Sequence, residues 1–244
     1  MTNFPSLSVI VPCYNEKSTI LEVIESLISL EFVNEIIIID DASNDGTDFI
    51  LKDIRNDRIQ VVTHPRNLGK GAAIRSGINI ASCDYLVIQD ADLEYYPTDI
   101  PLLLDVAHTQ NADAVFGSRF LTYGHRRAVY YWHRLGNAFL THFSNAMTNI
   151  YLTDMETCYK LMRTKIAKSM DLKENRFGIE PEFTAKLAAV GASVYEVPIR
   201  YTARTYEEGK KINWKDGFSA LRAIIKYSMP WQKRAMRQRY LELK

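Results

Sequence analysis

The sequence predicts an α/β fold with a mostly parallel central sheet and helices on both of its faces. Short apolar, β-branched runs alternate with segments of helical periodicity through the first half of the chain, which is typical of parallel strands joined by crossover helices. Acid-rich segments directly follow several of these runs. The chain has 244 residues, 47% of them hydrophobic and 24% charged, which suits a domain with one sizeable core.

The elements of the first half follow from local patterns. Strands are expected where β-branched and other apolar residues run together, over 7–11, 36–39, 59–63, 85–89 and 114–117. Ile20, Ile24 and Leu27 recur at helical spacing, and a turn at 44–46 precedes the next helical segment. Helices are therefore expected around 20–28, 47–54, 70–81 and 99–108.

The second half of the chain is less regular. Amphipathic patterns predict helices over 131–148, 182–190 and 214–227. Apolar runs predict strands over 159–162 and 194–201. Because the chain shows no internal repeat or linker, we expect one domain over 1–227 and a basic C-terminal tail over 228–244.

Two carboxylates, Asp90 and Asp92, follow the expected strand at 85–89 and are separated by Ala91. An open α/β sheet binds its ligand at the carboxyl ends of its strands. Side chains alternate along an extended chain, so one carboxylate can hold a divalent metal and the other a ligand. A metal on a diphosphate stabilises a nucleotide leaving group. Alone, however, such a pair is weak evidence, because a solvated strand end or a helix cap explains it more often.

Two earlier strands also end in polar residues. The first leads into Pro12, which ends the strand ladder, and Tyr14 and Glu16 follow it. Tyr14 can stack on a base, and Glu16 can accept from a ribose or cap the next helix. Asp41 follows the second strand, where an acid suits a ribose hydroxyl or a base edge. Turn and cap chemistry explains each loop separately, but their convergence on one rim favours a ligand site.

A glycine-rich segment, 67–71, opens the expected helix at 70–81. It resembles a phosphate cradle with Lys70 supplying charge, although a plain glycine-rich helix entry explains it about as well. It lacks the full P-loop spacing and has no Ser or Thr after the lysine, which disfavours a Walker-type ATPase.

Charge and cysteine content narrow the class of protein. The formal net charge of +1 argues against binding to nucleic acid by bulk charge. Three cysteines, Cys13, Cys83 and Cys158, form no CxxC pair, which fits a reducing compartment. No signal peptide or transmembrane segment is expected, so we expect a cytoplasmic location.

The polar motifs resemble those of a known family in both order and spacing. The motifs at 11–16, 39–47, 67–71 and 90–93 are similar to those of family 2 glycosyltransferases with the GT-A fold. Motifs further along resemble the dolichyl-phosphate mannosyltransferase-like branch; they lie at 117–120, 153–160, 177–182, 197–199 and 204–212. The resemblance spans roughly residues 7–227.

The resemblance implies a nucleotide-sugar donor and a divalent metal, Mg²⁺ or Mn²⁺. Asp90 and Asp92 would serve donor and metal, and Glu94, where the branch commonly has Gln, is a further candidate ligand. The segment at 204–212 favours UDP over GDP, because it is closer to bacterial relatives than to the mannosyltransferases. The donor-binding residues expected are Pro12, Tyr14, Asn15, Glu16, Asp41, Lys70, Asp90, Ala91 and Arg119.

The same branch transfers its sugar, with inversion, to a polyprenyl phosphate. Arg204, with Lys210 or Lys211, would hold the acceptor phosphate, and Asp154 stands where the family often has an acid near the acceptor. Asp92, Asp154 and Arg204 are thus the expected catalytic residues. A phosphate with a second pKa of about 6 is already nucleophilic at neutral pH, so the reaction needs charge screening and alignment rather than a strong base.

A polyprenyl acceptor requires access to a membrane. The expected helix at 214–227 has an apolar side, followed by Trp231 and a basic end that suit an anionic cytoplasmic membrane face. A helix packed on the core with a solvated tail is the alternative. A membrane-anchoring partner subunit or a homo-oligomer also remains open. The apolar side comprises Trp214, Phe218, Leu221, Ala223, Ile224, Ile225 and Tyr227.

Three other functions remain open at this point. A family 2 glycosyltransferase acting on a sugar or protein hydroxyl would need a general base, for which Asp154, Glu156 and Glu180 are candidates. A nucleotidyltransferase would share the sheet and the metal carboxylates but release pyrophosphate. A non-catalytic nucleotide-sugar-binding module is disfavoured by the intact acids.

Overall fold

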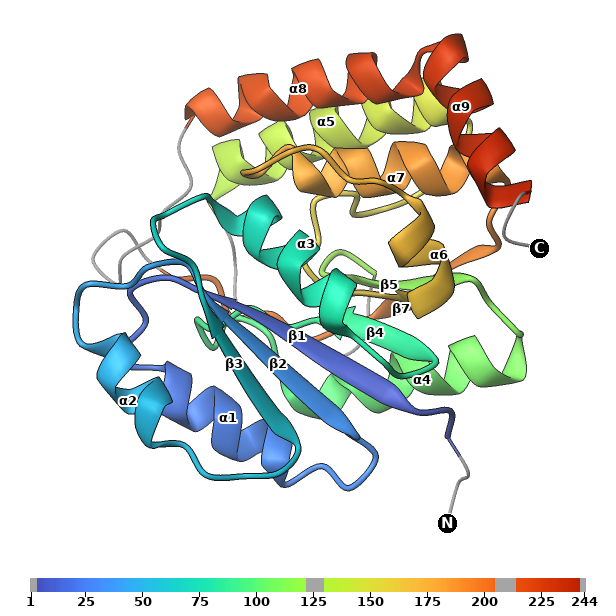
Figure 1. Cartoon of the computed structure of the whole chain (residues 1–244). Coiled ribbons are helices and arrows are strands. Elements are labelled where there is room, and N and C mark those ends of the chain that lie inside the picture. Colours follow the sequence, from blue (N-terminus) through green and yellow to red (C-terminus); the bar gives the residue numbers. More distant parts are fainter. Residues whose placement is uncertain (1–3, 122–129, 205–213, 242–244) are drawn as a thin grey trace.

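The computed structural model describes residues 4–121, 130–204 and 214–241, and a seven-stranded sheet forms its centre (Figure 1). The strand order is β3-β2-β1-β4-β6-β5-β7. All pairs are parallel except those that β6 makes with β4 and β5. The strands are β1 (Leu7–Cys13), β2 (Glu35–Asp40), β3 (Ile59–Thr63), β4 (Tyr85–Ile88), β5 (Ala114–Ser118), β6 (Lys160–Arg163) and β7 (Val194–Pro198).

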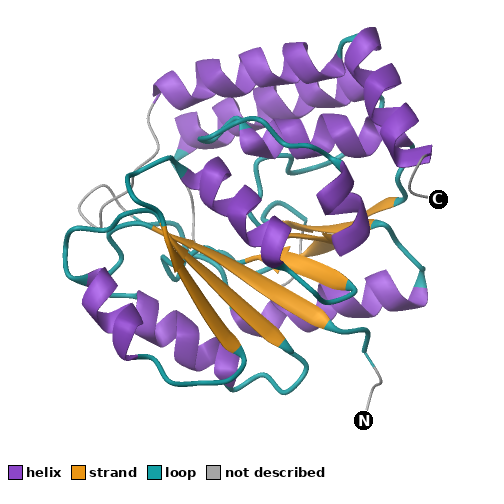
Figure 2. Ribbon diagram, in the orientation of Figure 1, coloured by secondary structure: helices purple, strands orange, loops and turns teal. Residues whose placement is uncertain are grey.

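Helices cover both faces of the sheet, as the alternating pattern predicts (Figure 2). One face carries α1 (Ile20–Ile28), α2 (Thr47–Asp53) and α4 (Ile100–Thr109). The other carries α3 (Lys70–Ile80), α6 (Thr164–Ser169) and a bundle of α5 (Tyr131–Thr148), α7 (Ile179–Val190), α8 (Trp214–Ser228) and α9 (Pro230–Leu241). The predicted mixed α/β class with a mostly parallel sheet is therefore confirmed.

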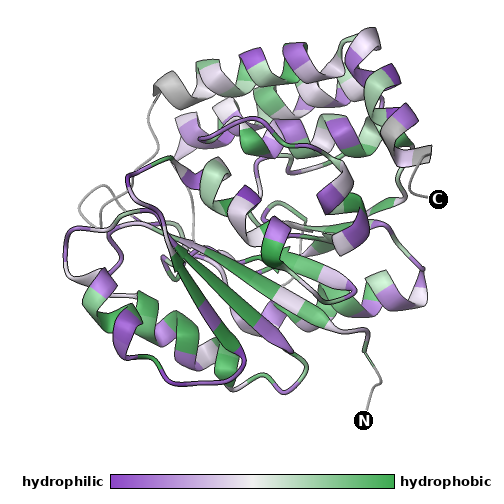
Figure 3. Cartoon of the chain, in the orientation of Figure 1, coloured by the Kyte–Doolittle hydropathy of each residue, from purple (hydrophilic) through white to green (hydrophobic). Residues whose placement is uncertain are grey.

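The core consists of the strands and the helix faces against them. The strands are green with apolar residues in Figure 3, and Val9, Ile10, Ile38 and Ile88 are completely buried. Strands covered on both faces read as continuous apolar runs, and this explains why their positions could be predicted closely.

Chain reversal beside β1 creates the place for a site. The chain builds β1, β2 and β3 outward in one direction and then returns through α3 to β4 on the other side of β1. The loops that follow β1 and β4 diverge at such a point, and this leaves a crevice at their carboxyl ends. Asp40 pairs in register with Cys13 and with Thr63, so the ends of β1, β2 and β3 lie level.

Several boundaries differ from the sequence predictions for physical reasons. β7 ends at Pro198 rather than continuing to 201, because proline ends a strand ladder. α7 begins at Ile179, three residues before the predicted start. The short helix α6 and the 3₁₀ turn at Pro97–Asp99 were not predicted. Neither was the antiparallel direction of β6, which no local pattern encodes.

The C-terminal region packs on the protein more than its sequence suggested. On the α8 side that was expected to face a membrane, Ala223, Ile224 and Tyr227 are at most 3% exposed, whereas Phe218 and Ile225 are 67% and 38% exposed. The side chain of Trp214, predicted on the same side, lies outside the described residues. The segment expected as a free tail forms α9, whose Met236 is buried. No helix among the described residues is long and apolar enough to cross a membrane.

Candidate active site

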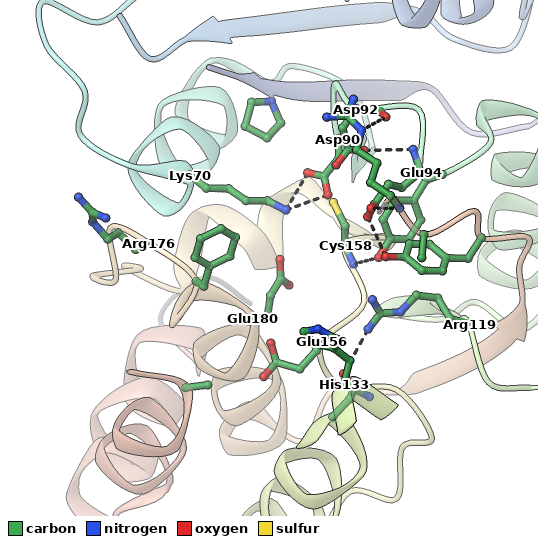
Figure 4. A pocket seen from close by; sticks show the side chains of 18 of the residues that line it. Lys70, Asp90, Asp92, Glu94, Arg119, His133, Glu156, Cys158, Arg176 and Glu180 are labelled. Carbon is green, nitrogen blue, oxygen red and sulfur yellow. Dashed lines mark hydrogen bonds and ion pairs between the residues drawn. The ribbon is translucent and has the colours of Figure 1, made fainter. Parts of the chain in front are cut away.

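A cavity of about 1070 Å³ opens at the carboxyl ends of β1, β2 and β4. Pro12, Asp41 and Asp90 reach it from the strand ends, and helices α5, α7 and α8 form its opposite wall. Figure 4 shows acids and bases from both halves of the chain facing this one space. The strand-end loops that the sequence placed on one rim therefore do converge.

Lys70 and Asp90 form an ion pair inside the cavity. The Lys70 Nζ lies 2.7 Å from Asp90 Oδ1 and 2.9 Å from Oδ2 (Figure 4). Burial disfavours the ammonium, but the Asp90 carboxylate and weaker charges nearby outweigh it and raise the pKa of Lys70 well above its ordinary value. Lys70 is therefore a fixed cation beside the first carboxylate of the Asp90–Asp92 pair.

Asp92 lies in an environment that disfavours its charge. Burial first, and then the negative charges of Asp90 and Glu94, raise the pKa of Asp92 to about 7. A divalent cation between Asp90 and Asp92 would relieve this repulsion. Among the described residues no group of three or more His, Cys, Asp or Glu is arranged to hold a metal. Two carboxylates nevertheless fit Mg²⁺ or Mn²⁺, because Mg²⁺ is usually bound by one or two carboxylates plus substrate phosphates and water.

Glu94 connects the loop after β4 to the chain segment after β7. One Glu94 oxygen accepts a 2.7 Å hydrogen bond from the Tyr201 hydroxyl, and the other accepts a 2.7 Å bond from the backbone N–H of Arg204. The side chain predicted as a third metal ligand thus uses both oxygens on the protein. We therefore restrict the proposed ligands to Asp90 and Asp92 and assign Glu94 to hold this segment.

Arg204, from the segment after β7, contacts the loop after β4 that carries Asp90 and Asp92. Its Nε donates to the backbone oxygen of Asp92 at 2.9 Å, and its Nη2 lies 3.1 Å from Glu16 Oε2. Both Arg204 and Glu16 line the cavity. The predicted acceptor arginine and a predicted donor residue are therefore direct neighbours. The predicted partners Lys210 and Lys211 lie outside the described residues.

Arg119 reaches the cavity because Asp154 holds it there. Its Nε donates to Asp154 Oδ2 at 2.7 Å and its Nη2 to Oδ1 at 2.8 Å, and Asp154 is completely buried. Burial opposes the guanidinium charge, but Asp154 outweighs it and raises the pKa of Arg119 well above its ordinary value. Asp154 itself does not line the cavity. It positions Arg119 rather than acting as the predicted acid near the acceptor.

The glycine-rich segment is not a free phosphate cradle. Asp41 accepts the backbone N–H groups of Leu68 and Gly69, at 2.8 and 2.7 Å, and also bonds His64. The N–H of Ala72, at the start of α3, donates to the Asn175 backbone oxygen at 3.2 Å. These three amides are therefore already engaged within the protein and are not open to a phosphate.

Close packing explains the glycines of this segment. A Cβ on Gly71 would lie 2.3 Å from the Glu174 backbone oxygen, and one on Gly69 would lie 2.4 Å from that of Asn175. Gly69 also has φ +98°, which favours glycine. The segment docks against the loop before α7 and thereby aims Lys70 at Asp90.

The remaining predicted donor residues divide into two groups. Pro12, Tyr14, Glu16 and Ala91 line the cavity. Asn15 does not; its backbone N–H donates to the Ser43 hydroxyl and its side-chain oxygen accepts the N–H of Asn44, so it ties two rim loops together.

Glu156 and Glu180 are cavity residues that the sequence suggested only as possible bases. Burial, followed by the charge of Glu180, raises the pKa of Glu156 to about 7. The completely buried Lys160 is hydrogen-bonded to Glu180. Sequence reasoning missed Lys160, because a lysine beside a short apolar run looks like a strand-end surface residue. It also missed Trp132 and His133 of α5, although aromatic residues at the start of an amphipathic helix were a usable signal.

Sequence comparison identifies relatives along most of the chain. The family described as Glycosyl transferase family 2 matches residues 8–170. An uncharacterized protein of Methanocaldococcus jannaschii is 27% identical over 228 residues, which cover 91% of this chain and 92% of that protein. The glycosyltransferase AglJ of Haloferax volcanii is 28% identical over 200 residues, which cover 82% of this chain and 64% of AglJ.

Solved structures share the fold. Glucosyl-3-phosphoglycerate synthase from Mycobacterium tuberculosis, in complex with Mn²⁺, uridine diphosphate and phosphoglyceric acid, superposes with a TM-score of 0.68 at 18% identity. The match covers 92% of this chain and 78% of that one. The GT-A arrangement expected from the motifs is therefore confirmed as the fold of this chain.

Proposed function

The chain belongs to glycosyl transferase family 2, and we propose that it transfers a sugar, with inversion, from a UDP-sugar to a polyprenyl phosphate, as in the dolichyl-phosphate mannosyltransferase-like branch. One observation carries the proposal. The same cavity has acids and cations at the strand ends and reaches α5, whose Trp132 and Leu140 line it and whose outer surface is exposed and aromatic. Such a space suits an acceptor with a charged head and a lipid tail.

The donor side rests on Asp90 and Asp92. We propose that they hold Mg²⁺ or Mn²⁺, which would neutralise the diphosphate as it departs. Lys70, fixed against Asp90, adds positive charge beside the same phosphates. Tyr14 is partly exposed at the rim, where a base can stack on it. The synthase with the same fold was crystallised with Mn²⁺ and uridine diphosphate, which supports this choice.

The acceptor side rests on Arg204, and Arg119, which the sequence predicted to bind the donor phosphates, lies in the same cavity. Guanidinium groups bind phosphate through several N–H donors at once, and both groups line the cavity. A phosphate oxygen of the acceptor attacks the anomeric carbon from the face opposite the diphosphate, and the bond from that carbon to the diphosphate oxygen breaks. The nucleoside diphosphate leaves with the electron pair. No proton has to be removed, because the attacking phosphate is already ionised.

The outer surface of α5 suits a membrane. Tyr131, Trp132 and Phe139 are 70%, 77% and 59% exposed, and Leu135 is exposed between them. The residues that α5 buries are the small polar Thr141, Ser144 and Thr148. A helix that exposes aromatic residues and buries hydroxyls is unusual for a surface in contact with water alone. Because Trp132 also lines the cavity, a lipid anchored at this surface could reach the site.

A second acceptor class is favoured by one observation. The pKa of Glu156, raised to about 7, is suited to a general base that would activate a sugar or protein hydroxyl. For this role Glu156 would have to reach the acceptor hydroxyl. The identity of the acceptor alone distinguishes this candidate function from transfer to a polyprenyl phosphate.

A transfer assay tests the proposal. The purified chain with Mn²⁺ is incubated with labelled UDP-sugars or GDP-mannose, and with a short polyprenyl phosphate or a set of hydroxyl acceptors. We expect label in the lipid phase and free UDP. Label only in a water-soluble glycoside would favour the hydroxyl acceptor, and release of pyrophosphate would indicate a nucleotidyltransferase. A chain that binds donor without any transfer or hydrolysis would be a binding module.

A flotation assay with anionic liposomes tests the membrane surface. The double variant Trp132→Ala/Phe139→Ala should lose most of its binding to the vesicles. Phe49→Ala is a matched control, because Phe49 is 69% exposed on α2 at the other face of the sheet. Equal binding by the wild type, the double variant and Phe49→Ala would contradict the assignment of α5 as the contact surface.

A further inference from the structure

We propose that Glu156 and Glu180 form a carboxylate pair that binds hydroxyl groups of the transferred sugar and selects an uncharged sugar over a uronic acid. The inference rests on the proposed function and adds the class of donor sugar. It assigns a recognition role to two residues outside the expected site.

Both residues line the cavity, and each has one carboxyl oxygen without a hydrogen-bond partner among the described residues. These oxygens, Glu156 Oε1 and Glu180 Oε1, are buried, and Glu180 is only 4% exposed. A buried acceptor without a donor costs about 1–3 kcal/mol, so two of them in residues that line one cavity call for a ligand that brings donors.

The pair is held rigidly by Lys160. The Lys160 ammonium, completely buried, bonds Glu180 Oε2 and the backbone oxygens of Met155 and Thr157, which flank Glu156. One cation thereby fixes the loop that carries Glu156 and the first turn of α7 that carries Glu180. The two unused oxygens are presented from a preorganised frame, as sugar recognition requires.

The pair lies where the donor sugar would extend from its diphosphate. Figure 4 shows Glu180 and Glu156 in the space below the Lys70–Asp90 pair, and Glu180 is close enough to raise the pKa of Lys70. A sugar attached to a diphosphate at Asp90 and Asp92 would point toward this space. Phosphates themselves would be repelled by the two carboxylates and remain at the lysine.

Charge decides which sugar fits. Lys160 compensates one of the two carboxylates, and the second faces Arg119 and Asp154 at longer range. A sugar hydroxyl both donates and accepts, so it satisfies either protonation state of the pair. A uronate carboxylate brings a further negative charge and no donor in its ionised form, so it would be repelled.

Calorimetric titration of the manganese-loaded protein tests the inference. UDP measures nucleotide binding alone; UDP-glucose, UDP-galactose and UDP-N-acetylglucosamine measure the gain from an uncharged sugar; UDP-glucuronate measures an acidic one. In the wild type we expect one uncharged donor to bind at least about tenfold more tightly than UDP-glucuronate. Glu156→Gln should lower the ratio of that donor's affinity to that of UDP by about fivefold and leave UDP binding unchanged.

Glu180→Gln should improve UDP-glucuronate binding about tenfold, because it leaves the Lys160 charge to attract the uronate. Glu35→Gln is the matched control: Glu35 is a half-buried acid that accepts from Ser8 and Ser82 at the start of β2, the opposite end of the strands from the cavity. Thermal melts confirm that each variant is folded. If Glu180→Gln does not fold, Glu156→Gln and the wild-type panel still decide.

Three results would overturn the inference. In the first, UDP-glucuronate binds the wild type as tightly as the best uncharged donor. In the second, none of the three uncharged donors binds better than UDP. In the third, Glu156→Gln lowers kcat while the affinity ratio stays unchanged, and Glu156 would then be a base for a hydroxyl acceptor. In each case UDP still binds, whereas a wild type that binds no UDP contradicts the proposed donor itself.

Discussion

Two parts of this molecule stabilise their charged side chains in different ways. The donor half, which holds the proposed nucleotide site, ends at Asp92, and the acceptor half begins at Arg119. Up to Asp92, the rim acid Asp41 is held by the backbone amides of Leu68 and Gly69, and Asp90 by the partly exposed Lys70. From Arg119 onward, fully or largely buried ion pairs join separate segments of chain, namely Arg119–Asp154 and Lys160–Glu180. The first half therefore relies on backbone amides and a partly exposed ion pair, whereas the second relies on ion pairs buried in the protein.

The largest effect should come from the carboxylate pair of the donor half. Asp92→Ala removes a proposed metal ligand and should lower transfer by at least about a thousandfold, about 4 kcal/mol of transition-state stabilisation. Chelation of the metal should have the same effect in the wild type, and Mn²⁺ should restore it. Initial rates with and without chelator provide the measurement. Near-normal turnover of the variant would remove Asp92 from the mechanism.

The buried pairs of the acceptor half should carry stability. Lys160→Ala leaves Glu180 buried without its partner and should lower the free energy of unfolding by about 3–5 kcal/mol. The control in the donor half is Lys52→Ala, which removes an exposed pair with Asp48 and should cost no more than about 0.5 kcal/mol. Urea titrations compare the two. Equal losses would show that the halves do not differ in this respect.

The contact between the halves should be intolerant of one methyl group. Gly71→Ala places a Cβ against the Glu174 backbone oxygen and should cost about 2–3 kcal/mol, because backbone has to move. Gly136→Ala in α5 meets nothing within 4 Å and should instead stabilise the helix by about 0.5–1 kcal/mol. Thermal melts provide the measurement. A stable Gly71→Ala variant would mean that the loop before α7 yields easily.

The smallest predicted effect depends on pH. The pKa of Glu156 is about 7 in the folded protein, above its ordinary value, so the native state holds this proton more tightly than the unfolded chain. Stability is therefore lost as pH rises from about 4 to 7. Glu156→Gln removes this loss. The free energy of unfolding of the variant, relative to the wild type, should therefore be about 1–2 kcal/mol higher at pH 8 than at pH 4. The urea unfolding midpoints of the wild type and the variant provide the measurement across this pH range. A difference between the two proteins that does not change with pH would contradict the burial of Glu156 beside Glu180.

The contrast between the halves also separates what the sequence could predict from what it could not. Buried parallel strands appear as continuous apolar runs, and the residue after each run must lie at the rim, so Asp90 and Asp41 were placed correctly. Glu94 and Asp154, by contrast, have hydrogen-bond partners that lie far along the chain. Which acid contacts ligand and which holds another side chain depends on those partners.

Lys160 shows most clearly what could not be predicted from the sequence. Its burial depends on Glu180, twenty residues further along and on another element, and on an antiparallel strand whose direction no local pattern encodes. The glycine-rich segment was predicted in part: Lys70 does reach the cavity, but the role of the glycines was not foreseen. Its composition suggested a ligand contact, but its small residues serve close approach of a distant loop.

The antiparallel strand β6 gives the sheet an unusual kind of modularity. The chain leaves the sheet after β5 and returns in β6 as the direct neighbour of β5, so residues 119–159 form a detour whose two ends lie side by side. Changes of length or sequence within that detour leave the pairing of every strand intact. Arg119, α5 and Glu156 all belong to it, whereas Asp90 and Asp92 do not. In evolutionary terms, a lineage could change the exposed surface of α5 and the proposed sugar contact at Glu156 by rewriting this one excursion, while Asp90 and Asp92 stayed as they were.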